Sequence, residues 1–166
     1  MMNDTYGKLT IYDWNPTLAA GAVDANDVLV DGETLEDILP NAGKPALLSE
    51  VQVIVKDVDT PADAAPKLEI VIFDDIAADL GLIDAAVSIT DAHAVSVLGV
   101  IVVETTDYTD WVGSQRAQVK NVNLILRAKP GATEPRDLRA GIIDRTGTLP
   151  TWTASGLTVR FGIIHT

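Results

Sequence analysis

The chain has 166 residues, with 24 acidic residues against 12 Lys and Arg and a net charge of −12. A hydrophobic content of 47% is too high for a disordered acidic chain, and the length suits one domain with a core of its own. The absence of cysteine excludes disulfides, thiol catalysis and metal sites that need Cys ligands.

The N-terminus lacks the basic start and apolar run of a secretory signal, and no apolar stretch approaches the ~20 residues that span a bilayer. We therefore expect a protein that is made and kept in the cytosol unless it is assembled into something larger, and that has no membrane partner.

Charge is distributed unevenly along the chain. Residues 1–110 hold 21 acids and 4 bases, whereas residues 111–166 hold 3 acids and 8 bases. The eight bases form no run, and the net charge repels phosphate, so we expect no nucleic-acid partner. Two explanations stay open: opposite charges meet on adjacent strands of one fold, or they meet between copies of the chain.

In chain order, the hydrophobic pattern predicts mostly strands. Residues 8–14 form a short strand or an extended arm, and Asp31-Gly32 suggests a tight hairpin turn. Alternating apolar residues indicate strands over 47–56 and 67–73, which we interpret as an antiparallel pair joined by a long loop. One short helix is expected near residues 91–98, capped by Thr90 or Asp91.

The second half continues with a β-branched strand at 99–104 and a longer one at 115–128, in which the alternation slips at Lys120-Asn121 and suggests a bulge. Further strands are expected at 138–143 and 157–163. Many short strands without a βαβ rhythm predict an all-β fold, an antiparallel β-sandwich of jelly-roll type. We expect one domain over residues 1–166, with residues 1–44 as a loop-rich N-terminal arm.

Motifs that carry chemistry are missing from the sequence. It contains no nucleophile elbow, phosphate-binding loop or dinucleotide fingerprint, and His93 and His165 have no metal-ligand spacing. We therefore expect no enzyme, no cofactor and no metal. Loop acids leave calcium binding as an alternative to ordinary turn residues; they are Asp57, Asp59, Asp63, Asp74, Asp75 and Asp79.

The three tryptophans, Trp14, Trp111 and Trp152, fall in or beside expected loops. Each is either an anchor at an interface or a cap over one end of the sandwich core. The N-terminal apolar and aromatic segment is our candidate for docking onto a neighbour, together with basic residues of the second half. The candidate partner contacts are Tyr6, Leu9, Ile11, Tyr12, Trp14, Arg127, Arg136 and Arg139.

From about Leu47 onward the chain resembles the head decoration, or cement, proteins of tailed bacteriophages. Four stretches carry the resemblance: Val51–Asp57, Ser88-Ile89-Thr90-Asp91-Ala92 leading to Leu98-Gly99-Val100, Val119–Leu124, and Leu149–Gly162. These are structural motifs without chemistry.

The resemblance implies a non-enzymatic virion protein. It implies a β-sandwich that sits on the outer capsid surface, bridges subunits of the major capsid protein and self-associates, with a homotrimer favoured over a dimer. Two alternatives stay open: an adhesin domain of a tail or fibre that binds host glycans through the loops of Trp111 and Trp152, and a calcium-dependent or hydrolytic accessory domain.

Overall fold

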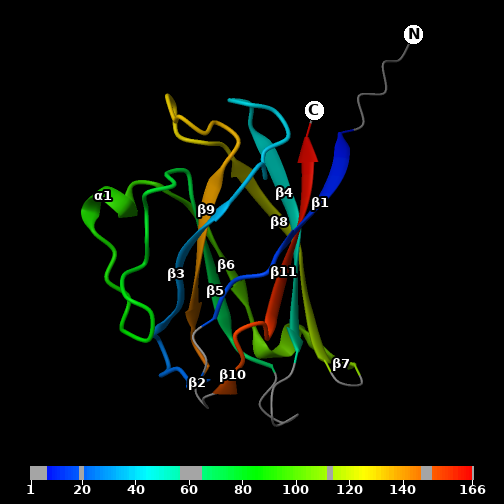
Figure 1. The fold of residues 1–166 in the computed structure, drawn as a ribbon. Coiled ribbons are helices and arrows are strands. Elements are labelled where there is room, and N and C mark those ends of the chain that lie inside the picture. Colours follow the sequence, from blue (N-terminus) through cyan, green and yellow to red (C-terminus); the bar gives the residue numbers. More distant parts are fainter. Residues whose placement is uncertain (1–6, 19–20, 57–64, 112–113, 147–150, 166) are drawn as a thin grey trace.

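The computed structural model describes residues 7–18, 21–56, 65–111, 114–146 and 151–165, and nearly all regular structure in these ranges is β-strand (Figure 1). The five-stranded sheet has the order β1 (Lys8–Trp14), β11 (Leu157–His165), β4 (Ala46–Lys56), β8 (Ser114–Leu126), β7 (Tyr108–Trp111). The four-stranded sheet has the order β3 (Val28–Leu35), β9 (Leu138–Asp144), β5 (Leu68–Phe73), β6 (Val97–Val103).

Smaller elements connect the two sheets. Strands β2 (Gly21–Ala22) and β10 (Thr151–Trp152) form a two-stranded ribbon. A 3₁₀ turn, η2 (Thr105–Asp107), leads into β7, and a single helical turn, α1 (Asp91–Ala94), lies between β5 and β6. Within the described residues, no helix has the length and apolarity needed to cross a membrane.

The strand pairs are nested in the chain. The first strand pairs with the last, β1 with β11, and the pairing continues inward through β2 with β10, β3 with β9, β4 with β8 and β5 with β6. All of these pairs are antiparallel. A nested antiparallel hairpin of this kind, rolled into two sheets, is a jelly roll. The fold class predicted from the sequence is therefore confirmed.

The core lies between the two sheets and is built by the alternation of each strand. Phe161, Val53 and Ile70 point inward and are fully buried. Trp14 joins this core: its ring stacks on Phe161 at a centroid distance of 6.2 Å, and its Nε1 donates a 2.9 Å hydrogen bond to Oε2 of Glu33. Of the two expectations for residues 8–14, a short strand or an extended arm, the structure shows the strand.

The connection between β5 and β6, residues 74–96, covers the outer face of the four-stranded sheet (Figure 1). Leu80 and Ala78 pack with Val28, Phe73 and Ile143 in a second small core. Backbone bonds hold the connection in place: the N–H of Leu80 donates to the carbonyl of Asp31 at 2.7 Å. The connection therefore covers this face over β3, β9 and β5, while Val100 and Val102 of β6 remain exposed.

Three local predictions need correction. β4 and β5 do not pair with each other, because the chain between them crosses from one sheet to the other. Asp31-Gly32 is not a hairpin turn, since β3 runs through it with a register shift beside Val30. The helix is shorter than 91–98: Thr90 caps it as expected, but it ends at Ala94 because Val97 already pairs with Phe73.

The expected bulge near Lys120-Asn121 is confirmed. Between the pairs Leu48 with Leu124 and Glu50 with Lys120, β8 holds two residues more than β4. Asn121 and Asn123 absorb the excess in the left-handed region, at φ of 58° and 53°. Asn tolerates this conformation better than most residues.

Candidate docking face

The outer face of the five-stranded sheet carries a row of apolar side chains. Leu9 of β1 lies opposite Ile164 of β11, Ile164 opposite Leu47 of β4, and Leu47 opposite Ile125 of β8. Residues directly opposite in antiparallel strands are in contact range on one face. We call these four residues the apolar row, and the outer face of β1, β11, β4 and β8 the docking face.

The apolar row is open to solvent. Leu9 is 54% exposed and Ile125 is 64% exposed, and Leu47 and Ile164 between them are half-buried. Ile11, one outward position further along β1, adds an exposure of 48%. Contiguous exposed apolar surface is typical of interaction sites. No other described segment packs over this row in the way that residues 74–96 cover the opposite sheet.

The charged residues of the docking face have a net sign opposite to that of the whole chain. In register on this face lie four bases, Lys56, Arg116, Lys120 and Arg160, against two acids, Asp13 and Glu50. The chain as a whole carries −12. The docking face therefore favours a partner surface on which an apolar patch lies beside an acidic one.

One ion pair of this face is bidentate. Nε and Nη2 of Arg160 donate to the two carboxylate oxygens of Asp13 at 2.6 and 2.9 Å. This hydrogen bonding holds the pKa of Asp13 below its usual range and raises the pKa of Arg160. The pair keeps β1 aligned with β11, and both side chains remain partly exposed.

A polar hollow of about 540 Å³ lies at the end of the docking face away from the apolar row. Nζ of Lys56 donates to Oγ1 of Thr158 at 3.0 Å, and that hydroxyl donates to Oδ1 of Asn15 at 2.8 Å. The residues lining the hollow are Asp13, Asn15, Ile54, Lys56, Ser114, Arg116, Thr158 and Arg160. With three cations and one carboxylate, it suits an anionic group of a partner.

The predicted N-terminal contacts divide between the two faces of β1. Leu9 and Ile11 point outward on the docking face, whereas Tyr12 packs against the core. Trp14 is only 5% exposed, so its side chain has no free surface for a partner and we remove it from the candidate contacts. Tyr6 lies outside the described residues.

Two of the three predicted basic contacts, Arg136 and Arg139, bind other parts of the chain. Arg136 donates from Nε to the carbonyl of Leu39 at 3.1 Å and pairs with Asp37, and Arg139 donates to the carbonyl of Ile76 at 3.0 Å. Both side chains are therefore engaged within the chain. Arg127 is exposed just after the end of β8.

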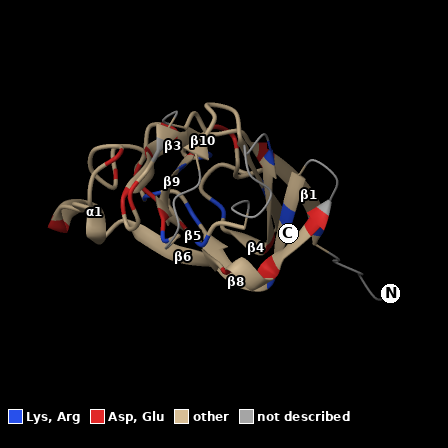
Figure 2. Cartoon of the chain, turned by 90° about the horizontal axis from the view of Figure 1, so that it is seen from below, with Lys and Arg blue, Asp and Glu red and all other residues tan. Residues whose placement is uncertain are grey.

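Charges that are separated along the sequence come close to each other in the folded chain, in which Figure 2 marks Lys and Arg in blue and Asp and Glu in red. Bases of the second half meet acids of the first: Arg160 with Asp13, Arg145 with Glu69 at 2.9 Å and Lys129 with Asp75 at 2.6 Å. The explanation that opposite charges from distant segments meet on neighbouring strands is confirmed for Asp13 with Arg160 and for Glu69 with Arg145, whereas Lys129 and Asp75 meet just beyond the ends of two strands.

One of the two tryptophans predicted to bind host glycans, Trp152, has no exposed face on which a sugar could stack. Trp152 is buried, and its Nε1 donates to Oδ2 of Asp144 at 3.0 Å. The side chain of Trp111 lies outside the described part of the chain. The adhesin alternative thereby loses Trp152, one of its two candidate residues.

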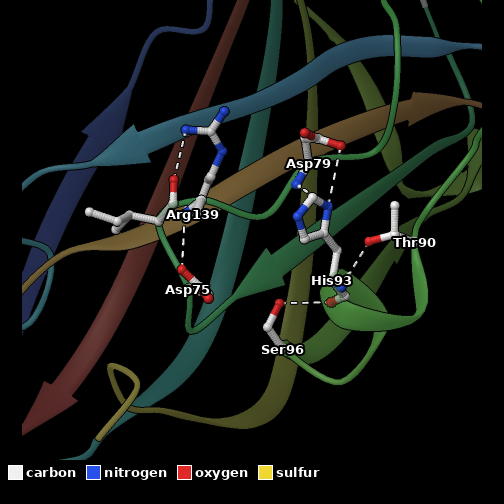
Figure 3. A network of polar contacts seen from close by, with 8 residues as sticks. Asp75, Asp79, Thr90, His93, Ser96 and Arg139 are labelled. Atoms are coloured by element: carbon white, nitrogen blue, oxygen red, sulfur yellow. Dashed lines mark hydrogen bonds and ion pairs between the residues drawn. The ribbon is translucent and has the colours of Figure 1, made fainter. Parts of the chain in front are cut away.

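His93 links two parts of the connection between β5 and β6, residues 74–96, which we call the covering connection (Figure 3). Its Nδ1 lies 3.4 Å from both the backbone nitrogen and Oδ1 of Asp79. Nδ1 accepts from that N–H when it carries no proton and donates to the carboxylate when it carries one. It therefore makes only one of these two contacts at a time. His93 is thus a partnered packing residue. Among the described residues no three acidic or histidine side chains gather as a metal site, and Asp57, Asp59 and Asp63 lie outside them.

Residues Leu47, Ile125 and Ile164 were missed by the sequence analysis. Each occupies an ordinary apolar strand position, and only the register of β1, β11, β4 and β8 aligns them. A weak signal exists in the sequence, because each stands next to a buried apolar residue and so breaks the simple alternation of its strand.

No family model matches the chain, and no curated protein matches it. Three solved structures to which it is similar are a chain of Desmodium yellow mottle tymovirus (14% identity, 95% of this chain and 80% of that chain covered, TM-score 0.30), one of Macrobrachium rosenbergii nodavirus (13%, 98% and 94%, 0.37) and one of the capsid of Ralstonia phage GP4 (14%, 100% and 90%, 0.38). At these identities and TM-scores, the likeness assigns neither a family nor a function.

Proposed function

We propose that the protein is a non-enzymatic structural protein of a virion, which binds the outer surface of a phage head and bridges subunits of the major capsid protein. The observation that carries the proposal is the apolar row of Leu9, Ile164, Leu47 and Ile125, left open on one sheet while the chain covers β3, β9 and β5 of the other sheet. The docking face lies against the capsid, with the apolar row as the apolar part of the contact.

Three further points support this function. The jelly roll is an architecture used by viral capsid domains, although a fold alone does not assign a role. The stretches from Val51 to Gly162 resemble phage decoration proteins. The local excess of bases on the docking face orients an otherwise acidic protein, so that electrostatic attraction speeds encounter and selects one face.

Co-sedimentation of the purified protein with mature, undecorated heads of the virus that encodes it tests the proposal. We expect saturable binding at a fixed ratio to the major capsid protein, weakened by added salt because the docking face carries excess bases. A well-folded sample that remains in the supernatant at every concentration would overturn the proposed function.

A further inference from the structure

The free edge of the five-stranded sheet is formed by β1, which pairs with β11 on one side only (Figure 1). The strand is regular: seven consecutive residue pairs join it to β11 without a register shift. It contains no proline and one lysine, Lys8. Prolines, bulges and charged side chains protect exposed edges, and in β1 the charges lie toward the two ends, at Lys8 and Asp13. The middle of the strand, Leu9–Tyr12, carries no charge and is a template for another strand.

We propose that the occupant of this edge is a second copy of the chain, with the two β1 strands pairing antiparallel about a two-fold axis at Thr10. Such an axis is perpendicular to the sheet, so outward residues must face outward residues. Axes at Thr10, Ile11 or Tyr12 keep five or more of the seven residues of β1 paired. The side chains discriminate among these three registers.

The axis at Thr10 places Leu9 opposite Ile11 of the second copy, twice by symmetry. These two outward side chains are exposed in the single copy, and their pairing joins the apolar rows of both copies. An axis at Ile11 would pair Ile11 with itself but would set Leu9 against the carboxylate of Asp13. An axis at Tyr12 would set Ile11 against that carboxylate. The Thr10 register is therefore favoured by apolar pairing.

The charged residues of β1 are compatible with this antiparallel pair. In the Thr10 register Lys8 lies opposite Tyr12 and Asp13 lies opposite Gly7, so no two like charges face each other. Asp13 is already bound by Arg160 of its own chain, so no unpaired carboxylate is added to the contact.

The geometry of this dimer has a consequence for bridging, which rests on the proposed function. Because the axis is perpendicular to the sheet, both docking faces point to the same side. One dimer would then present two docking faces to the capsid, and simultaneous binding of both would raise the apparent affinity. The pairing favours a dimer over the trimer expected from the sequence.

The first test measures mass in the absence of heads, so its outcome is independent of capsid binding. Light scattering over a concentration series should show a monomer that converts to a species of twice the chain mass. A monomer at every concentration, or a trimer, would overturn the pairing.

The second test reads the register with single cysteines, for which the cysteine-free chain is a clean background. Opposed residues in an antiparallel pair lie close enough for a disulfide. Under mild oxidation Thr10→Cys should cross-link, whereas Leu9→Cys and Ile11→Cys should not exceed Leu82→Cys, a control on the covering connection with 80% exposure. Cross-linking of Thr10→Cys no faster than the control would contradict the axis at Thr10.

The third test uses opposite charges. Leu9→Lys and Ile11→Glu should each weaken self-association about tenfold or more, because each sets a charge against an apolar side chain. An equimolar mixture should recover dimers, since the ammonium group introduced at position 9 of one variant then faces the carboxylate introduced at position 11 of the other. A failure of the mixture to recover dimers, with both variants folded by circular dichroism, would contradict the register.

Discussion

Nε1 of Trp152 donates a 3.0 Å hydrogen bond to Oδ2 of Asp144, and both side chains are buried. The second carboxylate oxygen, Oδ1, accepts from the backbone N–H of Thr146 at 2.8 Å. The contact fastens the short ribbon of β2 and β10 to the end of β9. Burial raises the pKa of Asp144, and the hydrogen bonds from Thr146 and Trp152 oppose that rise without cancelling it.

Replacing Trp152 by Phe removes the donor and leaves a buried carboxylate oxygen without its partner. We expect the free energy of unfolding to fall by about 1–3 kcal/mol, measured by urea denaturation. Trp14→Phe is the matched control, because its Nε1 bonds to Glu33, which is only half-buried and can be rehydrated. An equal or larger loss for Trp14→Phe would contradict the importance of burial at Asp144.

The raised pKa of Asp144 predicts a pH dependence of stability. Between the unfolded pKa of about 3.9 and the higher folded pKa, the folded state binds more protons, so the contribution of Asp144 to stability decreases as pH rises. Asp144→Asn removes this titration. The difference in unfolding free energy between the wild type and Asp144→Asn should therefore be more favourable to the wild type near pH 4 than at pH 7.

The control for this pH dependence lies in the other acids, which titrate equally in both proteins and cancel in the difference. Asp13 and Asp75, whose pKa values are lowered by Arg160 and Lys129, are examples. Parallel stability curves for the wild type and Asp144→Asn would show that Asp144 does not titrate differently in the folded state.

Gly141 leaves the space that Leu80 of the covering connection occupies. A Cβ at this position would lie 2.5 Å from Cδ1 of Leu80 and 2.9 Å from the carbonyl oxygen of Val30. We expect Gly141→Ala to destabilise the fold by about 1–3 kcal/mol in urea denaturation. The double variant with Leu80→Ala should lose less than the sum of the two single variants, because the smaller side chain relieves one of the two contacts. Strict additivity would argue against a direct contact.

The strands of this fold were largely predictable because their apolar residues alternate. Val51, Val53 and Val55 alternate with more polar neighbours, and all three point into the core. The slip at Lys120-Asn121 predicted the bulge for the same local reason. Such signals depend on neighbours in sequence, and the sequence displays them directly.

Partners distant in the chain were not predictable. Nothing local indicates that β4 pairs with β11 rather than β5, or that Asp13 meets Arg160, which lies 147 positions away. Asp31-Gly32 has the composition of a hairpin turn, but pairing of β3 with β9 on both sides of it keeps the strand running. The docking face is hidden for the same reason, since the alignment of Leu47, Ile164 and Ile125 depends on three long-range registers.

The most direct test of the account compares two equal changes on opposite sides of the molecule. Ile125→Glu places a carboxylate in the apolar row, and Leu82→Glu makes the same charge change at an exposed leucine of the covering connection. In co-sedimentation with undecorated heads, we predict that Ile125→Glu loses about tenfold or more in affinity while Leu82→Glu binds like the wild type. Unchanged binding by a folded Ile125→Glu, or an equal loss in both variants, would contradict docking through this face.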